Sequence, residues 1–222
     1  MANVVITGAN RGIGLALVKQ YLDRGDTVYA LCRNSSDELA QTNAKIISKV
    51  DVGNPETLPE SLGALKDLKI DLLINNAGAY SSESIHDWDP NTIEHVYRVN
   101  AMGPLLVTQC LLGGLVRGGG GKIAMITSRM GSMADNSSGG RYGYRMSKAA
   151  LNAASVSLAQ DLKLDNVAVA ILHPGFVQTG MVNFNGDVSS DDSATNLVKR
   201  IDELNVENTG TFWHANGEVL PW

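Results

Sequence analysis

A glycine-rich turn close to the start of the chain constrains its fold more than any other feature. The segment Thr7-Gly8-Ala9-Asn10-Arg11-Gly12-Ile13-Gly14 follows the short apolar run Asn3–Thr7 and leads directly into a helical pattern over Ile13–Arg24. Glycine permits backbone angles and close approaches that other residues forbid. The free N–H groups at a helix N-terminus bind anions. A glycine cluster alone is also common in structural loops, but this order predicts a strand, a phosphate-binding turn and a helix.

The rest of the chain alternates short apolar runs with longer helical patterns, which indicates repeated βα units. The expected strands are Asn3–Thr7, Thr27–Cys32, Lys45–Val50, Leu68–Asn75, Lys122–Ser128, Val167–His173 and a weak one at Thr211–Trp213. The expected helices are Ile13–Arg24, Ser36–Thr42, Pro55–Leu65, Pro90–Leu112, Tyr142–Leu164 and Ser193–Leu204. We therefore predict an α/β fold: a single doubly wound (Rossmann) domain over residues 1–222. Its parallel sheet should have about seven strands with helices on both faces.

Composition and charge exclude several classes of protein. The 222 residues suit one such domain, and 44% hydrophobic with 18% charged residues is ordinary for a globular chain. A net charge of −5 without a dense Lys/Arg run argues against nucleic acid and anionic membranes as partners. No signal peptide or membrane-spanning apolar run is expected. Cys32 and Cys110 are expected to be reduced packing residues in a cytoplasmic protein.

The end of the second strand bears on the choice of dinucleotide. An acidic residue there favours a free ribose 2′-hydroxyl, whereas an arginine can hold a 2′-phosphate. The chain has Arg33 at this place and no carboxylate until Asp37, and Arg11 supplies a second cation inside the glycine turn. Either arginine alone could be a solvated surface residue. Both together favour NADP(H) over NAD(H).

Tyr144 and Lys148 lie four residues apart on a predicted helix and therefore share one face of it. A free tyrosine has a pKa of about 10, and a nearby cation should lower it. Tyr144 could then exchange a proton with a carbonyl or alcohol oxygen. Ser128 ends the fifth strand, where its hydroxyl could stabilise charge on that oxygen. Asn100 lies inside the long helix, where asparagine is a poor helix former.

Together these segments resemble the short-chain dehydrogenase/reductase family over nearly the whole chain. The resemblance rests on the glycine turn, Asn75-Asn76-Ala77-Gly78, Asn100, Ser128, Tyr144, Lys148 and Pro174-Gly175-Phe176-Val177-Gln178-Thr179. The stretches Ser128–Lys148 and Asn216–Trp222 resemble the C-factor and sniffer-type carbonyl reductase branch. The resemblance implies a catalytic set of Asn100, Ser128, Tyr144 and Lys148.

The family assigns further roles to these positions. Lys148 would hold the nicotinamide ribose, and Asn100 would hold a water that links Lys148 to solvent. Asp51 would contact the adenine, although a capping aspartate is the alternative for it. The predicted cofactor-binding residues are Gly8, Asn10, Arg11, Gly12, Ile13, Gly14, Arg33, Asp51, Val52, Asn76, Ala77, Gly78, Tyr144, Lys148, Pro174, Gly175, Val177 and Thr179.

One departure from the family pattern leaves the serine open. Ser128 lies sixteen residues before Tyr144, which is more than the usual separation, whereas Ser132 lies twelve before it. We prefer Ser128 because it ends the strand and because residues 135–140 look like a loop extension. Ser132 would then line the substrate pocket.

The sequence thus predicts an NADP(H)-dependent oxidoreductase that interconverts a small carbonyl compound and an alcohol. The alternative is a dinucleotide-binding signalling or redox-sensor protein of C-factor type with little catalysis. A sugar epimerase or dehydratase is disfavoured, because the region after the cofactor loop is short. The histidines at 86, 95, 173 and 214 are scattered, so no metal is expected. The small-residue helix Tyr142–Leu164 suggests a homodimer or homotetramer. The substrate itself stays open.

Overall fold

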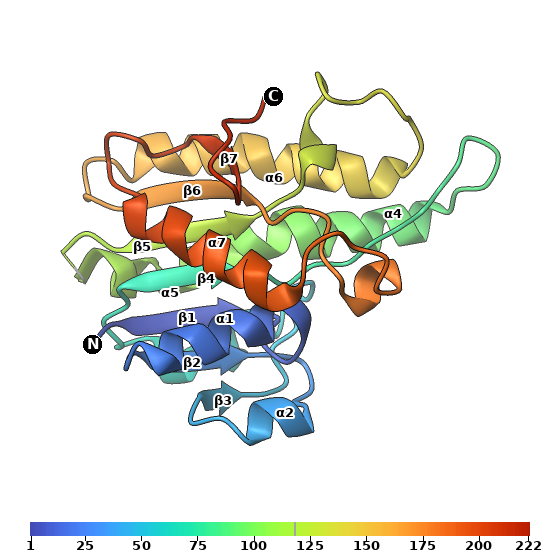
Figure 1. Cartoon of the computed structure of the whole chain (residues 1–222). Helices are drawn as coiled ribbons and strands as arrows, with labels where there is room; N and C mark the ends of the chain where they lie inside the picture. The colour runs from blue at the N-terminus through green and yellow to red at the C-terminus, as the bar shows by residue number, and fades with distance from the viewer. Residues whose placement is uncertain (118) are drawn as a thin grey trace.

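The computed structural model describes residues 1–117 and 119–222, through which a seven-stranded sheet runs (Figure 1). Its strands are β1 (Asn3–Thr7), β2 (Thr27–Leu31), β3 (Lys45–Ile47), β4 (Leu72–Asn75), β5 (Lys122–Ile126), β6 (Ala168–His173) and β7 (Phe212–His214). They lie in the order β3-β2-β1-β4-β5-β6-β7, and each neighbouring pair is parallel. The predicted doubly wound α/β fold is confirmed.

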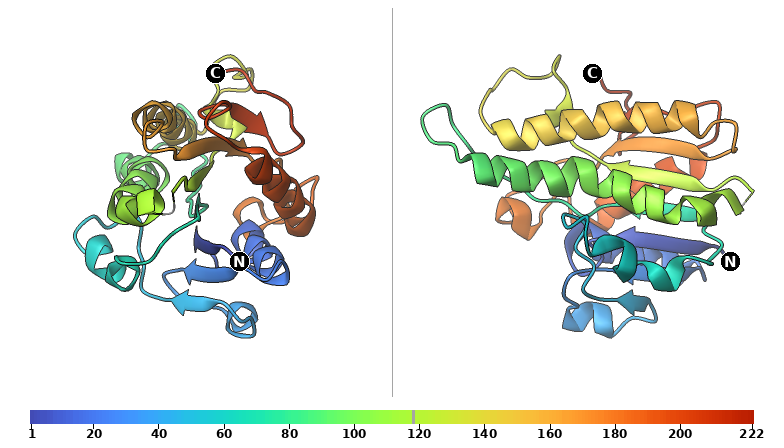
Figure 2. Two further views of the ribbon diagram at one scale, coloured as in Figure 1. Left: turned by 90° about the vertical axis from the view of Figure 1, so that its left-hand side faces the viewer. Right: turned by 180° about the vertical axis from the view of Figure 1, so that it is seen from behind.

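Helices cover both faces of this sheet (Figure 2). They are α1 (Gly12–Asp23), α2 (Asp37–Ala40), α3 (Leu58–Ser61), α4 (Pro90–Tyr97), α5 (Gly103–Arg117), α6 (Tyr142–Asp161) and α7 (Ser190–Glu203). One core packs α1 and α7 against one face, and a second core packs α3, α5 and α6 against the other. The central strands are therefore buried on both sides, which explains their continuous apolar sequences.

The strand order reverses at β1, because β2 and β3 follow on one side of it and β4 to β7 on the other. This reversal sets the position of the cleft. β1 pairs with β2 on one side and with β4 on the other, with Val5 opposite Leu73 in the second pair. Thr7 Oγ1 accepts hydrogen bonds of 3.0 Å from the main-chain N–H groups of both Asn76 and Ala77. The loops after β1 and β4 are thus held together where doubly wound sheets open a ligand crevice.

Several predicted boundaries differ from the structure. The predicted strand over Lys45–Val50 ends at Ile47, shortly before Lys49 takes a left-handed conformation with φ of 63°. The predicted helix Pro55–Leu65 is instead α3 followed by a short 3₁₀ turn over Gly63–Leu65. The last helix begins at Ser190 rather than Ser193, because the Ser189 side chain caps it by accepting from Asp192 N at 3.0 Å.

The long helix does not end at its predicted boundary, Leu112, before Gly113-Gly114. It continues to Arg117, and Gly114 packs against the main chain that leads into β4. A Cβ at Gly114 would lie 2.6 Å from the carbonyl oxygen of Leu68, so the glycine serves close packing and not termination. The four consecutive glycines at 118–121 predict a turn into the next strand, but Gly118 lies outside the described residues.

The expectation that no apolar run reaches membrane-spanning length was too strong. Among the described residues, α4, a π-helical segment and α5 form one continuous helix over Pro90–Arg117, with a mean hydropathy of 1.5 in its most apolar window. Of that window, 56% is buried inside the fold, where Val107, Leu111 and Leu115 pack in the core beside the sheet. Burial in the core explains the apolar composition of this helix.

Candidate active site

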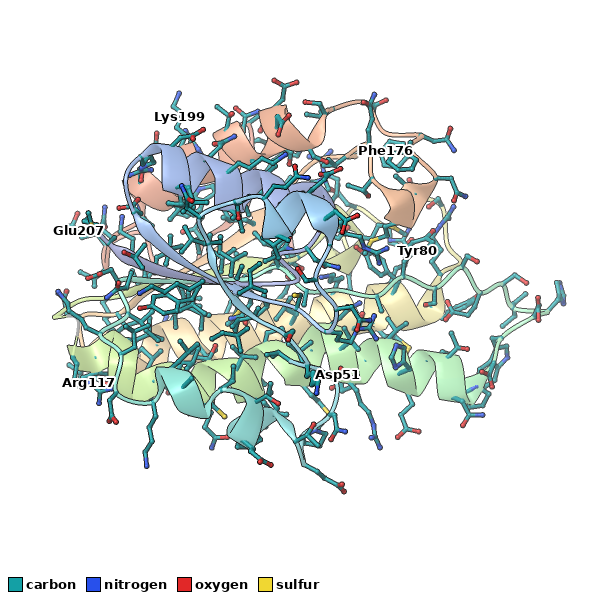
Figure 3. The ribbon with its side chains drawn as sticks, turned by 90° about the horizontal axis from the view of Figure 1, so that it is seen from below. Asp51, Tyr80, Arg117, Phe176, Lys199 and Glu207 are labelled. Carbon is teal, nitrogen blue, oxygen red and sulfur yellow. The ribbon has the colours of Figure 1, made fainter. Side chains whose placement is uncertain are left out.

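A cleft of about 970 Å³ opens at the carboxyl edge of the sheet. All the predicted cofactor-binding residues line it except Gly175 and Val177. Val177 is instead buried and pairs with Val188 in an isolated β-bridge, whereas Pro174 and Thr179 do line the cleft. Figure 3 shows Tyr80 and Phe176 toward this end of the molecule, with Arg117 and Glu207 at the opposite end.

The glycine turn forms one wall of the cleft. Gly8 and Gly12 have φ angles of 63° and 54°, which favour glycine. A Cβ at Gly14 would overlap the carbonyl oxygen of Gly8 and would lie 2.6 Å from Asn76 Nδ2. That amide nitrogen donates to the carbonyl oxygens of Thr7 and Gly8, at 3.0 and 3.1 Å. Asn76 therefore fixes the shape of the turn, a role that the sequence did not reveal.

The N-terminus of α1 is suited to an anionic group. Among the described residues no side chain caps this helix, and its first turn contains no acidic residue. Arg11, Lys19 and Arg33 supply positive charge along the cleft. Asp37, the first carboxylate after the second strand, and its neighbour Glu38 also line it. An uncapped helix end behind a glycine turn fits the diphosphate of a dinucleotide.

Tyr144 and Lys148 meet at the other end of the same cleft. Both side chains are buried, and Lys148 Nζ lies 5.8 Å from the centroid of the Tyr144 ring. Lys148 Nζ donates a hydrogen bond of 2.9 Å to the carbonyl oxygen of Ile126, at the end of β5. The side chain of Ser128 interacts with the Tyr144 phenol. The structure thus brings three of the four predicted catalytic side chains together.

The pKa of Tyr144 is shifted upward, whereas the sequence predicts that Lys148 lowers it. Burial raises the pKa of Tyr144 to about 12, although the interaction with Ser128 lowers it in part. Burial also lowers the pKa of Lys148 to about 8, because the ammonium group has left water. For both side chains burial is the largest cause of the shift. Tyr144 is therefore protonated at neutral pH and can act as an acid.

Asn100 lies in the π-helical segment Arg98–Met102 between α4 and α5. Its Nδ2 donates to Ala79 O at 2.8 Å and to Ser147 Oγ at 3.0 Å, and its Oδ1 accepts from Ala79 N at 2.8 Å. A Cβ at Gly78 would lie 3.4 Å from that Oδ1 and 3.9 Å from Lys148 Nζ. Asn100 thus ties the loop after β4 to the lysine region, and π-helical segments often mark functional sites.

The two candidate serines have different surroundings. Ser128 Oγ accepts from Met130 N at 3.1 Å and interacts with Tyr144. Ser132 Oγ accepts from Asp135 N at 3.1 Å and so shapes the following loop. The geometry therefore favours Ser128 as the serine that shares a substrate oxygen with Tyr144.

Tyr80 is a further residue of the site, beside the predicted catalytic set. Its ring packs edge-on against the ring of Tyr144, with 5.0 Å between the centroids. Its hydroxyl accepts a hydrogen bond of 2.7 Å from Arg141 Nε. No spacing rule could have paired Tyr80 with Tyr144, because 63 intervening residues separate them along the chain.

Two of the scattered histidines come together in space. The rings of His173 and His214 lie 4.9 Å apart at the ends of β6 and β7. The pKa of His173 is lowered to about 3, mainly by burial, so that ring is neutral. Across the described ranges 1–117 and 119–222, no group of three or more His, Cys, Asp or Glu side chains is arranged to hold a metal ion.

A doubly wound sheet with a glycine turn at its reversal point and a buried Tyr–Lys pair beside it defines a class, the dinucleotide-dependent oxidoreductases. The family model described as short chain dehydrogenase matches residues 2–190. The chain therefore belongs to the short-chain dehydrogenase family and is an oxidoreductase.

Relatives with known names agree with this assignment. The chain is 35% identical to 1-hydroxy-2-glutathionyl-2-methyl-3-butene dehydrogenase of Rhodococcus sp., over the full length of both chains. It is 42% identical to the C-signal protein of Myxococcus xanthus over 154 residues, which cover 69% of this chain and 93% of the relative.

Two solved structures are similar along the whole chain. The NADPH-bound carbonyl reductase from chicken fatty liver has a TM-score of 0.90 at 29% identity, covering 100% of this chain and 99% of its own. The carbonyl reductase Sniffer of D. melanogaster has the same score and identity and covers 100% of both chains. The predicted resemblance to the C-factor and sniffer-type branch is confirmed.

Proposed function

We propose that this protein is an NADP(H)-dependent carbonyl reductase that interconverts a small carbonyl compound and an alcohol. One observation carries the proposal: Tyr144 and Lys148 line the same cleft as the glycine turn and the uncapped end of α1. A dinucleotide held at one end would thus reach the proton donor at the other. The similar structures of carbonyl reductases support the choice of substrate class.

In this proposal each catalytic side chain has one task. The nicotinamide, when bound, supplies or accepts the hydride. Tyr144 gives its hydroxyl proton to the carbonyl oxygen, and Ser128 donates a hydrogen bond to that oxygen. Lys148 holds the nicotinamide ribose, and its positive charge favours the phenolate left after proton transfer. Because burial keeps Tyr144 protonated, the side chains are prepared for reduction of the carbonyl compound.

The preference for NADP(H) rests on Arg11 and Arg33, which line the adenosine end of the cleft. A guanidinium can form paired hydrogen bonds to a phosphate. Asp37 and Glu38 lie along the same cleft and would oppose a phosphate if they were closer to it than the arginines. We propose that the two arginines dominate, and the similar carbonyl reductase with bound NADPH supports this choice of cofactor.

The direct test is oxidation of NADPH and of NADH by the purified protein over a panel of aldehydes, ketones and quinones. We expect turnover with at least one carbonyl compound, faster with NADPH, and loss of that turnover in Tyr144→Phe. The matched control is Tyr97→Phe, which removes a half-exposed phenol from α4 that does not line the cleft. A preference for NADH would contradict the assigned cofactor.

A second candidate function is signalling or redox sensing with little catalysis, which the similarity to C-signal supports. Binding of a dinucleotide does not require Tyr144, so a sensor would tolerate its loss. If no compound of the carbonyl panel supports oxidation of NADPH or NADH, while a fluorescence titration shows tight NADPH binding, the sensor is favoured over the reductase.

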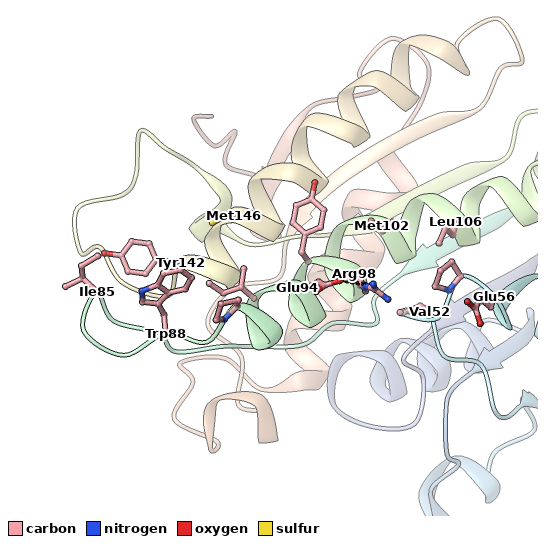
Figure 4. Close-up of a pocket in the computed structure, with 15 residues that line it drawn as sticks. Val52, Glu56, Ile85, Trp88, Glu94, Arg98, Met102, Leu106, Tyr142 and Met146 are labelled. Carbon is pink, nitrogen blue, oxygen red and sulfur yellow. Dashed lines mark hydrogen bonds and ion pairs between the residues drawn. The ribbon is translucent and has the colours of Figure 1, made fainter.

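We also propose that the protein forms a homodimer or homotetramer in the cytoplasm. An apolar groove of about 900 Å³ runs along α4 and the start of α5, beside the exposed side of α6 (Figure 4). Trp88, Met102 and Met146 are half-exposed there, at 55%, 42% and 53%. Sedimentation should report more than one copy, and a monomer at micromolar concentration would contradict this.

The proposed cytoplasmic location agrees with the cysteines. Both cysteines in the described part of the chain are free thiols, the form that a reducing compartment maintains.

A further inference from the structure

The helix that carries Tyr144 begins without a cap from its own preceding residue. Arg141 occupies the N-cap position of α6 but takes a left-handed conformation, with φ of 54° and ψ of 47°, and its side chain makes no capping hydrogen bond. Gly139 and Gly140 before it are also left-handed, with φ of 62° and 63°. A left-handed arginine is strained by about 1–2 kcal/mol, so another part of the chain must hold this turn.

Glu83, in the loop between β4 and α4, supplies the missing contacts. Its carbonyl oxygen accepts from Arg141 N at 2.7 Å, and its carboxylate Oε2 accepts from Gly143 N at 3.3 Å. The side chain is buried, with the whole residue only 8% exposed. A carboxylate at a helix N-terminus also interacts favourably with the helix dipole. Glu83 thus caps a twenty-residue helix from about sixty positions away in the sequence.

The Glu83 carboxylate can approach the main chain of α6 closely because Gly143 has no side chain. A Cβ at this position would lie 2.7 Å from Glu83 Oε1 and 3.0 Å from Ser81 Oγ. Both of these oxygens are buried and have no hydrogen-bond partner within residues 1–117 and 119–222. The carboxylate is therefore pressed against the main chain of the residue that immediately precedes Tyr144.

The same loop also contacts Tyr144 itself. Tyr80 packs against the Tyr144 ring and bonds to Arg141, and Asn100 holds both main-chain groups of Ala79. The segment from Ala79 to Glu83 is thus fastened at both ends, once to the Asn100 region and once to the first turn of α6. A shift of this turn moves the phenol together with its main chain.

We propose that Glu83 is a positioning residue that sets the place of Tyr144 by capping α6. The inference rests on the proposed function, because it assigns Glu83 a part in the proton transfer made by Tyr144. Glu83 accepts hydrogen bonds from Arg141 N and Gly143 N, so it acts through the main chain of α6. Small displacements of a catalytic group reduce the rate strongly, by about 100-fold for 1 Å.

Three variants test this proposal. Glu83→Ala removes the cap, whereas Glu83→Gln keeps an oxygen that can accept from Gly143 N and places an amide near Ser81 Oγ. We expect Glu83→Ala to lower kcat for carbonyl reduction by about 10- to 100-fold with little change in the KM for NADPH. Glu83→Gln should stay within about threefold of the wild type, since the capping bond is kept. Asp89→Ala is the control, because it removes a cap from α4 at Asn91 N and Thr92 N.

The second readout is amide hydrogen exchange of residues 142–148, which does not depend on turnover. We expect faster exchange in this segment for Glu83→Ala, wild-type exchange for Glu83→Gln, and no change there for Asp89→Ala. An equal kcat loss in Glu83→Gln and Glu83→Ala, or an unchanged kcat in Glu83→Ala, would overturn the proposal. If the wild type reduces no carbonyl compound, the proposed function fails, and unchanged exchange in Glu83→Ala would then separately reject the cap.

Discussion

Lys148 Nζ and the carbonyl oxygen of Ile126 are joined by a buried hydrogen bond of 2.9 Å. This bond holds the ammonium group at the end of β5, at 5.8 Å from the centroid of the Tyr144 ring. The contact does not compensate fully for burial, which lowers the pKa of Lys148. If Lys148 holds the ribose as proposed, its function comes at a cost to the stability of the protein.

We predict that Lys148→Met raises the melting temperature of the ligand-free protein below pH 8 while it abolishes carbonyl reduction. The pKa of Lys148 falls from 10.5 to about 8 on burial. Below pH 8 the lysine is charged in the folded and in the unfolded protein, so the folded protein bears the full cost of the buried charge. Between pH 8 and 10.5 the unfolded chain binds more protons, so wild-type stability rises with pH. The advantage of Lys148→Met should therefore shrink over this range.

Thermal unfolding over a series of pH values measures this difference. The control is Lys199→Met, which replaces an exposed lysine on α7 and should show no such pH dependence (Figure 3). If Lys148→Met melts below the wild type at pH 7, then the hydrogen bond to Ile126 outweighs desolvation, and the assigned direction of the pKa is wrong.

We predict that Ser128→Ala lowers kcat by about 100-fold or more, while Ser132→Ala changes mainly the KM of the carbonyl substrate. Ser128 interacts with the Tyr144 phenol, whereas Ser132 supports the following loop through Asp135 N. Steady-state kinetics of the two variants with one carbonyl compound separate these roles. The reverse pattern would exchange the assignments of the two serines.

We predict that Gly14→Ala abolishes NADPH binding and reduces stability, because its Cβ would overlap Gly8 O and crowd Asn76 Nδ2. Overpacking of this kind typically costs about 1–3 kcal/mol. Gly63→Ala is the control, since a Cβ there meets nothing within 4 Å. A fluorescence titration with NADPH and a thermal melt of both variants measure the two effects. Normal NADPH binding by Gly14→Ala would show that the turn adapts.

The fold could be predicted from the sequence because the features that set it are local. The glycine turn, the apolar runs and the helical periodicity each span a few consecutive residues, and β1 has the predicted bounds Asn3–Thr7. The predicted ends of helices and strands were less accurate where contacts between residues distant in the sequence decide them. Gly114 looks like a helix stop, but Leu68 O packs against it and the helix continues.

The candidate site could be predicted only where each residue belongs to a recognisable pattern. Tyr144 and Lys148 share a helix face, and Ser128 follows a strand, so topology brings them together. Tyr80 and Glu83 belong to an irregular loop without such a pattern, and their contacts with α6 depend on tertiary packing. The pKa of Tyr144 could not be read from spacing either, because burial dominates it.

Finally, we predict that Arg33→Ala raises the KM for NADPH by about 10- to 100-fold and leaves the KM for NADH nearly unchanged. A charge-assisted hydrogen bond contributes about 1.5–3 kcal/mol, and only NADPH carries the phosphate that would accept it. Arg11→Ala should act in the same direction, and the double variant should prefer NADH, because Asp37 and Glu38 then dominate this end of the cleft. Arg98→Ala is the control, since Arg98 pairs with Glu94 on α4. Equal losses for both cofactors would show that Arg33 supports the cleft generally and does not recognise the phosphate.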